Sequence, residues 1–211
     1  MMLADRQSAG KLLVRFLEKY RDNKQAIVLG LPRGGVVVAF EIAYALHLPL
    51  DVICPRKVGA PFNPELAIGA VTETGQGIFN HRLIKALGVS EKFLLEAIEK
   101  EKQQAQRRLS IFRKNRPPRE LKDKIVILVD DGLATGATMK AAIQSVRVEG
   151  AKKIVVAVPV APEDTLKEIQ LETDEVVCLD TPPFFEAIGQ FYQDFSQTED
   201  EEVLELLSEY Q

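Results

Sequence analysis

Two adjacent carboxylates and a loop of small and hydroxyl residues follow an apolar run near the middle of the chain. Asp130 and Asp131 come directly after residues 125–129, and Thr135 and Thr138 follow within eight positions. Carboxylates can accept hydrogen bonds from vicinal hydroxyls or ligate Mg²⁺, whereas threonine hydroxyls can donate to a phosphate. The stretch is therefore typical of a site for a phosphorylated sugar.

A buried strand and a helix are the elements that must position these residues. The run over 125–129 is apolar, rich in β-branched residues and without alternation, which predicts a strand buried on both faces of a sheet. A helix is predicted from Met139 to Val148. The start of a helix offers unpaired backbone N–H groups, and the small residues before it would let a phosphate approach them closely.

Two other phosphate-binding motifs fit this stretch less well. A Walker A loop ends in Gly-Lys-Ser/Thr, but Gly136 is followed by Ala137 and Thr138. No stretch of the chain has the G-x-G-x-x-G of dinucleotide-binding folds. The remaining alternative is a polar turn between the strand and the helix that binds no ligand. We disfavour it because the run, the Asp pair and Thr-Gly-x-Thr occur in register.

The site resembles the phosphoribosyl diphosphate (PRPP) signature of the type I phosphoribosyltransferases, through the sequence VDDGLATGAT at residues 129–138. The resemblance implies that Asp130 and Asp131 contact the ribose hydroxyls, with Mg²⁺ carried by PRPP near them and no direct metal ligand assigned. It also implies a loop around the 5-phosphate. That loop consists of Gly132, Ala134, Thr135, Gly136, Ala137 and Thr138.

One position departs from the pattern of the purine-salvage members, which have an Asp directly before the Thr-Gly. Ala134 stands at this position. The group that handles the acceptor proton therefore lies elsewhere in the chain, or the acceptor does not need one.

A second glycine loop follows a strand predicted over 26–30. It reads Leu-Pro-Arg-Gly-Gly and precedes a helix predicted over 36–46. Its glycines permit a close backbone approach to a ligand, and its arginine suits phosphate oxygens. In the family, a short loop at this place binds pyrophosphate, often through a non-proline cis peptide. The resemblance thus assigns pyrophosphate to Pro32, Arg33, Gly34 and Gly35, with Pro32–Arg33 as the candidate cis bond.

A charged stretch with three prolines covers residues 55–65 and is predicted to be a loop, followed by a hairpin over 66–73 and 76–80. Type I members close a mobile lid over PRPP at this place in the chain. The resemblance implies that Arg56 and Lys57 reach the pyrophosphate, and Glu65 is the candidate to handle the proton. The expected catalytic residues are Asp130, Asp131, Arg33, Lys57 and Glu65.

The alternation of strands and helices predicts an α/β fold with a doubly wound, mainly parallel sheet of five strands, flanked by helices. The further strands are expected over 50–54, 153–160 and 174–179, and the outer helices over 5–22, 90–113 and 198–210. We expect one domain over 1–211. Its parts are a core at about 26–180, a hairpin flap at 55–80 and a small C-terminal hood at 181–211.

Aromatic residues gather in the expected hood, where residues 181–195 hold five of the fourteen aromatics of the chain. Family members build a variable hood over the acceptor from such segments. Phe184, Phe185 and Tyr192 are therefore candidates to bind the acceptor by stacking on a planar base. The alternative is that these rings pack against the core or a partner subunit.

Charge is unevenly placed along the chain, whose net charge is −4. No Lys or Arg follows Lys167, and residues 168–211 carry 13 acidic groups. The basic remainder suits a small polyanion, and no pattern typical of nucleic-acid binding is evident. No membrane-spanning segment is expected, because no apolar stretch approaches membrane length, and no secretory signal is expected. Cys54 and Cys178 are expected to be buried reduced thiols of a cytoplasmic protein.

These features together predict an enzyme of nucleotide metabolism. It would transfer the 5-phosphoribosyl group from PRPP to a nitrogen acceptor, such as a nucleobase or a related small molecule, and release pyrophosphate. The family also suggests a homodimer. Two alternatives remain open: a non-catalytic regulator that senses PRPP, and a hydrolase in which water replaces the acceptor.

Overall fold

Five parallel strands form the central sheet of the computed structural model, which describes residues 1–114, 116–117 and 119–210, with the side chain of Glu65 left out. The strands are β1 (Ala26–Gly30), β2 (Leu50–Val52), β6 (Ile125–Val129), β7 (Lys153–Val160) and β8 (Glu175–Asp180). Their order is β2-β1-β6-β7-β8. This confirms the predicted doubly wound sheet.

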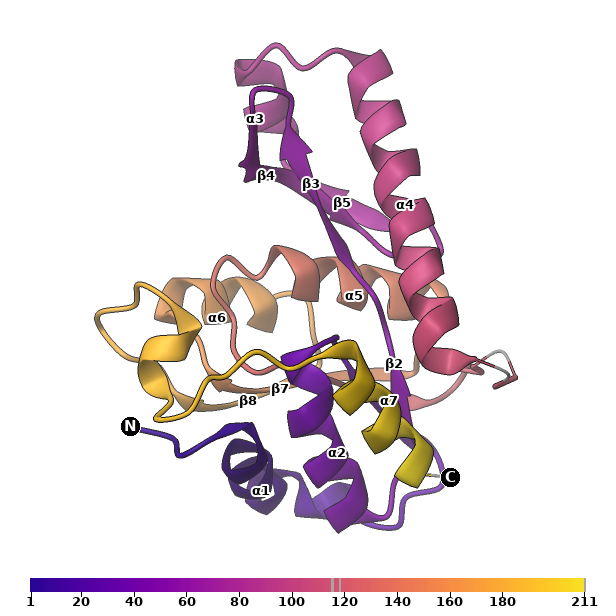
Figure 1. Cartoon of the computed structure of the whole chain (residues 1–211), viewed down its shortest axis with the longest axis vertical. Coiled ribbons are helices and arrows are strands. Elements are labelled where there is room, and N and C mark those ends of the chain that lie inside the picture. The colour runs from indigo at the N-terminus through magenta and orange to yellow at the C-terminus, as the bar shows by residue number, and fades with distance from the viewer. Residues whose placement is uncertain (115, 118, 211) are drawn as a thin grey trace.

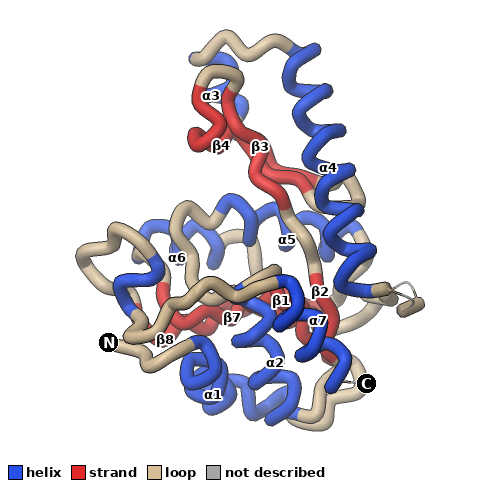
Figure 2. Tube along the Cα trace, viewed as in Figure 1, coloured by secondary structure: helices blue, strands red, loops and turns tan. Residues whose placement is uncertain are grey.

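Helices cover both faces of this sheet (Figures 1 and 2). One face carries α1 (Arg6–Leu17) and α2 (Gly34–Leu46), and the other carries α5 (Ala137–Val148) and α6 (Glu163–Gln170). Successive strand residues face opposite layers: Ile127 packs with the α1–α2 side and Leu128 with the α5–α6 side. The unbroken apolar runs predicted from the sequence are thus explained by burial on both faces.

A second sheet and two helices rise above the central sheet, and this second sheet corresponds to the predicted flap at 55–80 (Figure 1). Its strands are β3 (Arg56–Ala60), β4 (Asn63–Val71) and β5 (Gly77–Phe79), paired antiparallel in the order β3-β4-β5. The helices are α3 (His81–Ala86) and α4 (Glu91–Arg113), and Ser90 caps α4 as predicted. The predicted hairpin is confirmed by the antiparallel pairing of β4 with β5.

The predicted loop over 55–65 is wrong, because Arg56–Ala60 is a strand. Val58 and Ala60 alternate inward and pack against Ile68 and Val71 of β4. That gain in apolar burial outweighs the local signal of the prolines. The prolines and glycine still disturb the pairing, since the register shifts on both sides of Gly59.

The C-terminal segment runs back across the molecule. A short 3₁₀ turn, Ile188–Phe191, is followed by an irregular stretch and then by α7 (Asp200–Glu209), which contacts both α2 and α4 (Figure 1). Val203 and Leu207 bury its apolar face in the core. The predicted terminal helix is therefore confirmed. Among the described residues, no helix has the length and apolar character needed to cross a membrane.

Candidate active site

The two glycine loops predicted from the sequence meet at one edge of the central sheet. β1 and β6 pair so that Gly30 lies opposite Val129, which brings both strands to an end at the same level. Leu31 N donates to Val129 O at 2.9 Å and extends this pairing into the loops. Ligands bind at this edge in open α/β sheets. We call residues 31–35 the first loop and residues 130–136 the second loop.

Glycine is required where the loops touch. A Cβ at Gly35 would lie 2.8 Å from Asp130 Oδ1, and a Cβ at Gly34 would lie 2.0 Å from Asp131 Oδ2. Both positions would clash with the acidic pair if any side chain were present. The predicted Pro32–Arg33 cis peptide is confirmed and lies directly before them.

The two carboxylates of the pair have different surroundings. Asp130 Oδ1 accepts a hydrogen bond from Asp131 N at 2.9 Å. Burial, together with the negative charge of Asp131, raises the pKa of Asp130 well above its ordinary value. Asp131 Oδ2 instead accepts a hydrogen bond from Arg6 Nε at 2.7 Å. The carboxyl group of Asp130 is thus shifted toward its neutral form, whereas that of Asp131 forms an ion pair with Arg6.

Arg6 is a site residue that no sequence pattern singled out. It lies in the first turn of α1. Its Nη1 donates to Ser196 O at 2.7 Å, and its guanidinium lies 3.9 Å from the centre of the Phe195 ring. These contacts fix Arg6 against Asp131, which is 125 positions away in the chain. No local signal links such distant residues.

The second loop ends at the start of α5, as predicted. Gly136 adopts the left-handed conformation with φ 71°, and the first helical bond runs from Lys140 N to Gly136 O at 2.9 Å. The backbone N–H groups of residues 137–139 therefore have no hydrogen-bond acceptor within the helix. Ala134 and Thr135 are exposed to solvent, and Thr165 Oγ1 fixes the loop by donating to Ala134 O at 2.8 Å. The geometry suits an anion.

A cleft of about 590 Å³ lies between the flap and the second loop. Thr135, Ala137 and Lys140 line its floor, and Lys57 of β3 contributes a further polar group. The flap supplies a mainly apolar wall that includes Leu66, Ile68, Ile78 and Phe79. Glu168 of α6 also lines the cleft and forms an ion pair with Lys140. A ligand with both an anionic and an apolar part would match this lining. Glu65 also belongs to the flap, but its side chain lies outside the described residues.

Arg56 and Lys57 point in different directions because successive strand residues face opposite sides. Lys57 lines the cleft above the second loop, whereas Arg56 lines a separate groove beside α4, where its Nε donates to Glu101 Oε2 at 3.0 Å. Arg33 Nη1 lies 3.3 Å from Glu199 Oε2 at the start of α7. The structure thus brings Arg56, rather than Lys57, to the α7 side where Arg33 lies.

The hood aromatics differ in exposure. Phe184 is 85% exposed, whereas the ring of Phe185 packs on Phe191 with centroids 5.1 Å apart. Tyr192 is buried on Phe195, and its hydroxyl donates to Asp131 O at 2.6 Å. Burial raises the pKa of Tyr192. Tyr192 therefore holds the backbone of the acidic pair in place through this hydrogen bond. Of the three residues predicted to bind the acceptor, only Phe184 has an exposed ring.

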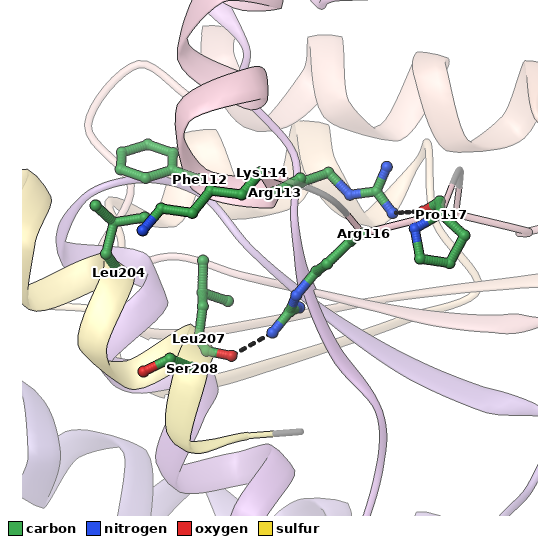
Figure 3. A pocket seen from close by; sticks show the side chains of 8 residues that line it. All are labelled: Phe112, Arg113, Lys114, Arg116, Pro117, Leu204, Leu207 and Ser208. Carbon is green, nitrogen blue, oxygen red and sulfur yellow. Dashed lines mark hydrogen bonds between the residues drawn. The ribbon is translucent and has the colours of Figure 1, made fainter.

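A further pocket of about 510 Å³ lies between the end of α4 and α7 (Figure 3). Two of the cationic side chains that line this pocket, Arg113 and Arg116, form contacts within the protein. Arg113 forms a two-pronged ion pair with Asp51, with Nε to Oδ1 at 3.0 Å and Nη2 to Oδ2 at 2.9 Å. Arg116 donates to the carbonyl of Leu207 on α7 (Figure 3). Arg116 thus attaches α7 to the body of the protein, Arg113 attaches the end of α4 to β2, and both lie apart from the two loops.

The described residues include no group of three or more His, Cys, Asp or Glu side chains placed to hold a metal ion. The acidic pair offers carboxylate oxygens, which are the ligands that Mg²⁺ prefers. It could therefore share an ion with a ligand that supplies further oxygens. Cys54 and Cys178 are free thiols, and burial raises the pKa of both.

The model of the phosphoribosyl transferase domain family matches residues 2–196, and the chain therefore belongs to this family. In Mycobacterium tuberculosis H37Rv, the protein named "Putative phosphoribosyl transferase Rv0571c" is 46% identical over 204 residues, which are 96% of this chain. The chain spans 46% of the length of that relative.

Solved structures show the same fold. The chain is similar to the protein TT1426 from Thermus thermophilus, with 41% identity, a TM-score of 0.85 and coverage of 100% of this chain and 99% of that one. A hypoxanthine phosphoribosyltransferase from Staphylococcus aureus shares the fold, with 14% identity, a TM-score of 0.50 and coverage of 87% of this chain and 79% of that one.

Proposed function

We propose that this protein transfers the 5-phosphoribosyl group of PRPP to a nitrogen acceptor and releases pyrophosphate. One observation carries the proposal: Gly34 and Gly35 approach Asp131 and Asp130 so closely that no side chain fits between them. This contact sets the candidate pyrophosphate loop directly beside carboxylates that suit ribose hydroxyls. The start of α5 supplies the third element, an anion site for the 5-phosphate.

PRPP would bind in three parts. The 5-phosphate would accept hydrogen bonds from the second loop and the first residues of α5, at Gly132 and from Ala134 to Thr138. The ribose hydroxyls would donate to Asp130 and Asp131, and the pyrophosphate would lie against Pro32 to Gly35. Mg²⁺ bound with PRPP would supply positive charge to the pyrophosphate oxygens.

Chemistry would proceed by separation of charge at ribose C1. Positive charge grows there as the C1–O bond to pyrophosphate breaks, and Arg33 would stabilise the departing anion. The acceptor nitrogen would then bond to C1 from the opposite face and lose its proton. Lys57 would approach the ligand from the cleft under the flap, and closure of the flap would exclude water. Glu65 stays our candidate for the proton, since Ala134 cannot take it.

The acceptor would be a nucleobase or a related small molecule. The apolar wall of the flap and the exposed ring of Phe184 favour a planar ligand. Phe185 and Tyr192 would contribute indirectly, because their packing holds the hood in place. We propose further that residues 1–211 form one domain, and that two copies associate as a dimer.

A regulator that senses PRPP without chemistry is the second candidate. It is favoured by Ala134 at the position where purine-salvage members have an Asp, and by the ion pairs that already engage Arg33. Such a protein would keep the same PRPP site.

Release of pyrophosphate separates the two candidates. We would incubate the protein with PRPP, Mg²⁺ and a panel of purine and pyrimidine bases, and detect pyrophosphate with a coupled enzyme assay. Release that depends on one base, and that Asp131→Asn abolishes, would support the transferase. Release without any base would indicate hydrolysis. No release, despite binding of PRPP, would support the regulator.

A further inference from the structure

Three arginines from separate parts of the chain converge beside the first loop. Arg33 belongs to that loop, Arg56 begins β3 and Arg108 lies on α4. Arg33 Nη1 lies 3.9 Å and Arg108 Nη2 lies 3.4 Å from the same atom, Oδ1 of Asp200 at the start of α7. Guanidinium groups that share an anionic oxygen in this way form the kind of site that also binds phosphate.

The cations around Asp200 are held in place by other contacts. Arg56 is tied to Glu101 of α4, and the guanidinium of Arg108 lies 5.7 Å from the centre of the Phe112 ring. A groove of about 230 Å³ opens beside them, lined by Arg56, Gln104, Arg107, Arg108, Ile111 and Asp200. Because the arginines are already oriented, an anion that enters the groove would incur a small ordering cost.

The acidic partners of these arginines are weakly held. The side chains of Glu199 and Asp200 are 59% and 40% exposed. Ion pairs at such exposure contribute little to stability, so they can be exchanged for another anion. A pyrophosphate group carries more negative charge and more acceptor oxygens than one carboxylate, and it would therefore compete well for Arg33 and Arg108.

We propose that Arg108 is a pyrophosphate-binding residue and that Asp200 occupies the position between Arg33 and Arg108 until a pyrophosphate group displaces it. This inference rests on the proposed function, which requires pyrophosphate at the first loop. It adds a residue from α4 that no signature motif contains. It also gives the acidic start of α7 a role, namely competition with the ligand for the same cations.

Calorimetric titration with inorganic pyrophosphate, PRPP and ribose 5-phosphate, each with Mg²⁺, tests the proposal. We expect Arg108→Ala to bind pyrophosphate and PRPP about 10- to 100-fold more weakly, the usual effect of losing one charge-assisted hydrogen bond. Affinity for ribose 5-phosphate should not change, because that ligand lacks the pyrophosphate. Asp200→Asn should bind pyrophosphate more tightly, because the competing charge is gone.

Arg15→Ala is the matched control, since it removes the same charge from an exposed position on α1. Wild-type pyrophosphate affinity in a folded Arg108→Ala variant would overturn the proposal. Weaker or unchanged pyrophosphate binding by Asp200→Asn would overturn the role of Asp200, and this variant keeps Arg108 intact. The experiment also separates failure of the proposed function from failure of this inference. If only the proposed function fails, the wild type will bind pyrophosphate through Arg108 but will not bind PRPP. Binding of neither ligand would refute both.

Discussion

Asp130 and Asp131 have the same side chain but opposite electrostatic surroundings. Asp130 is buried beside a like charge, whereas Asp131 faces the guanidinium of Arg6 at 2.7 Å. The ionised form of Asp130 is therefore disfavoured, whereas Asp131 has a guanidinium group beside it as a counter-charge. Such a pair is expected at a binding site, where a ligand that donates hydrogen bonds to both carboxylates relieves the repulsion.

The free energy of unfolding should reveal this difference. A raised pKa means that ionisation of Asp130 destabilises the fold once the pH rises through the folded-state value. Asp130→Asn mimics the neutral form, so we expect it to be more stable than the wild type at pH 7. Asp131→Asn leaves Arg6 without its carboxylate and should be about 1–3 kcal/mol less stable.

Urea denaturation at pH 7 and pH 3.5 would measure both effects. The advantage of Asp130→Asn should disappear at the lower pH, which lies below the ordinary pKa of 3.8 for this group. A variant that is destabilised equally at both pH values would contradict the assignment of unfavourable charge to Asp130.

At the scale of elements, a buried polar network joins the flap to the central sheet. Arg119 is 6% exposed and pairs with Glu149 at 2.8 Å and with Glu73, on the β4–β5 turn, at 2.5 Å. Ser145 of α5 bonds to Thr72 at 3.1 Å, next to Glu73. The base of the flap is thus fixed to the body, and any closure would have to bend the flap beyond this point.

Removal of the central cation should show how strongly the flap base depends on it. Arg119→Met leaves two glutamates close together with no counter-charge, so we expect the free energy of unfolding to fall by about 3–5 kcal/mol. Arg82→Met, on an exposed turn of α3, is the control and should change it by less than about 0.5 kcal/mol. Similar urea midpoints for the two variants would show that the network is dispensable.

A second element-scale prediction concerns the outer strand β8. Hydrogen bonds from Lys19, Tyr20 and Lys153 outweigh the opposing effect of desolvation and lower the pKa of Glu175 to about 2. A lowered pKa gives stability that is present above about pH 4.5 and is lost as the pH falls toward 2. We therefore expect the wild type to lose more stability between pH 6 and pH 3 than Glu175→Gln. Parallel pH profiles for the two proteins would contradict this.

At the scale of the whole molecule, the sequence predicted the sheet and the two loops because their signals are local. Apolar runs, glycines and adjacent carboxylates lie within a few residues of one another, and the register of β1 and β6 then joins the loops. The sequence could not predict Arg6, whose partner Asp131 is 125 positions away. It also failed at β3, where packing on β4 overrides a stretch rich in proline.

The C-terminal segment explains the remaining differences. Its aromatic residues suggested an acceptor wall, but most of them pack inward, and Tyr192 bonds to the backbone of Asp131. The acidic start of α7 then reaches the arginines of the first loop and of α4. Both ends of the chain therefore converge on the site, which only the folded chain can reveal.

Titration of PRPP with Mg²⁺ by calorimetry tests the central claim most directly, with the wild type beside the Asp130→Asn/Asp131→Asn double variant. A site built from both carboxylates predicts micromolar-range binding by the wild type. It also predicts loss of this binding in a double variant whose circular dichroism spectrum shows that it is folded. Absence of PRPP binding by the wild type, or equal binding by the two proteins, would contradict the proposed function.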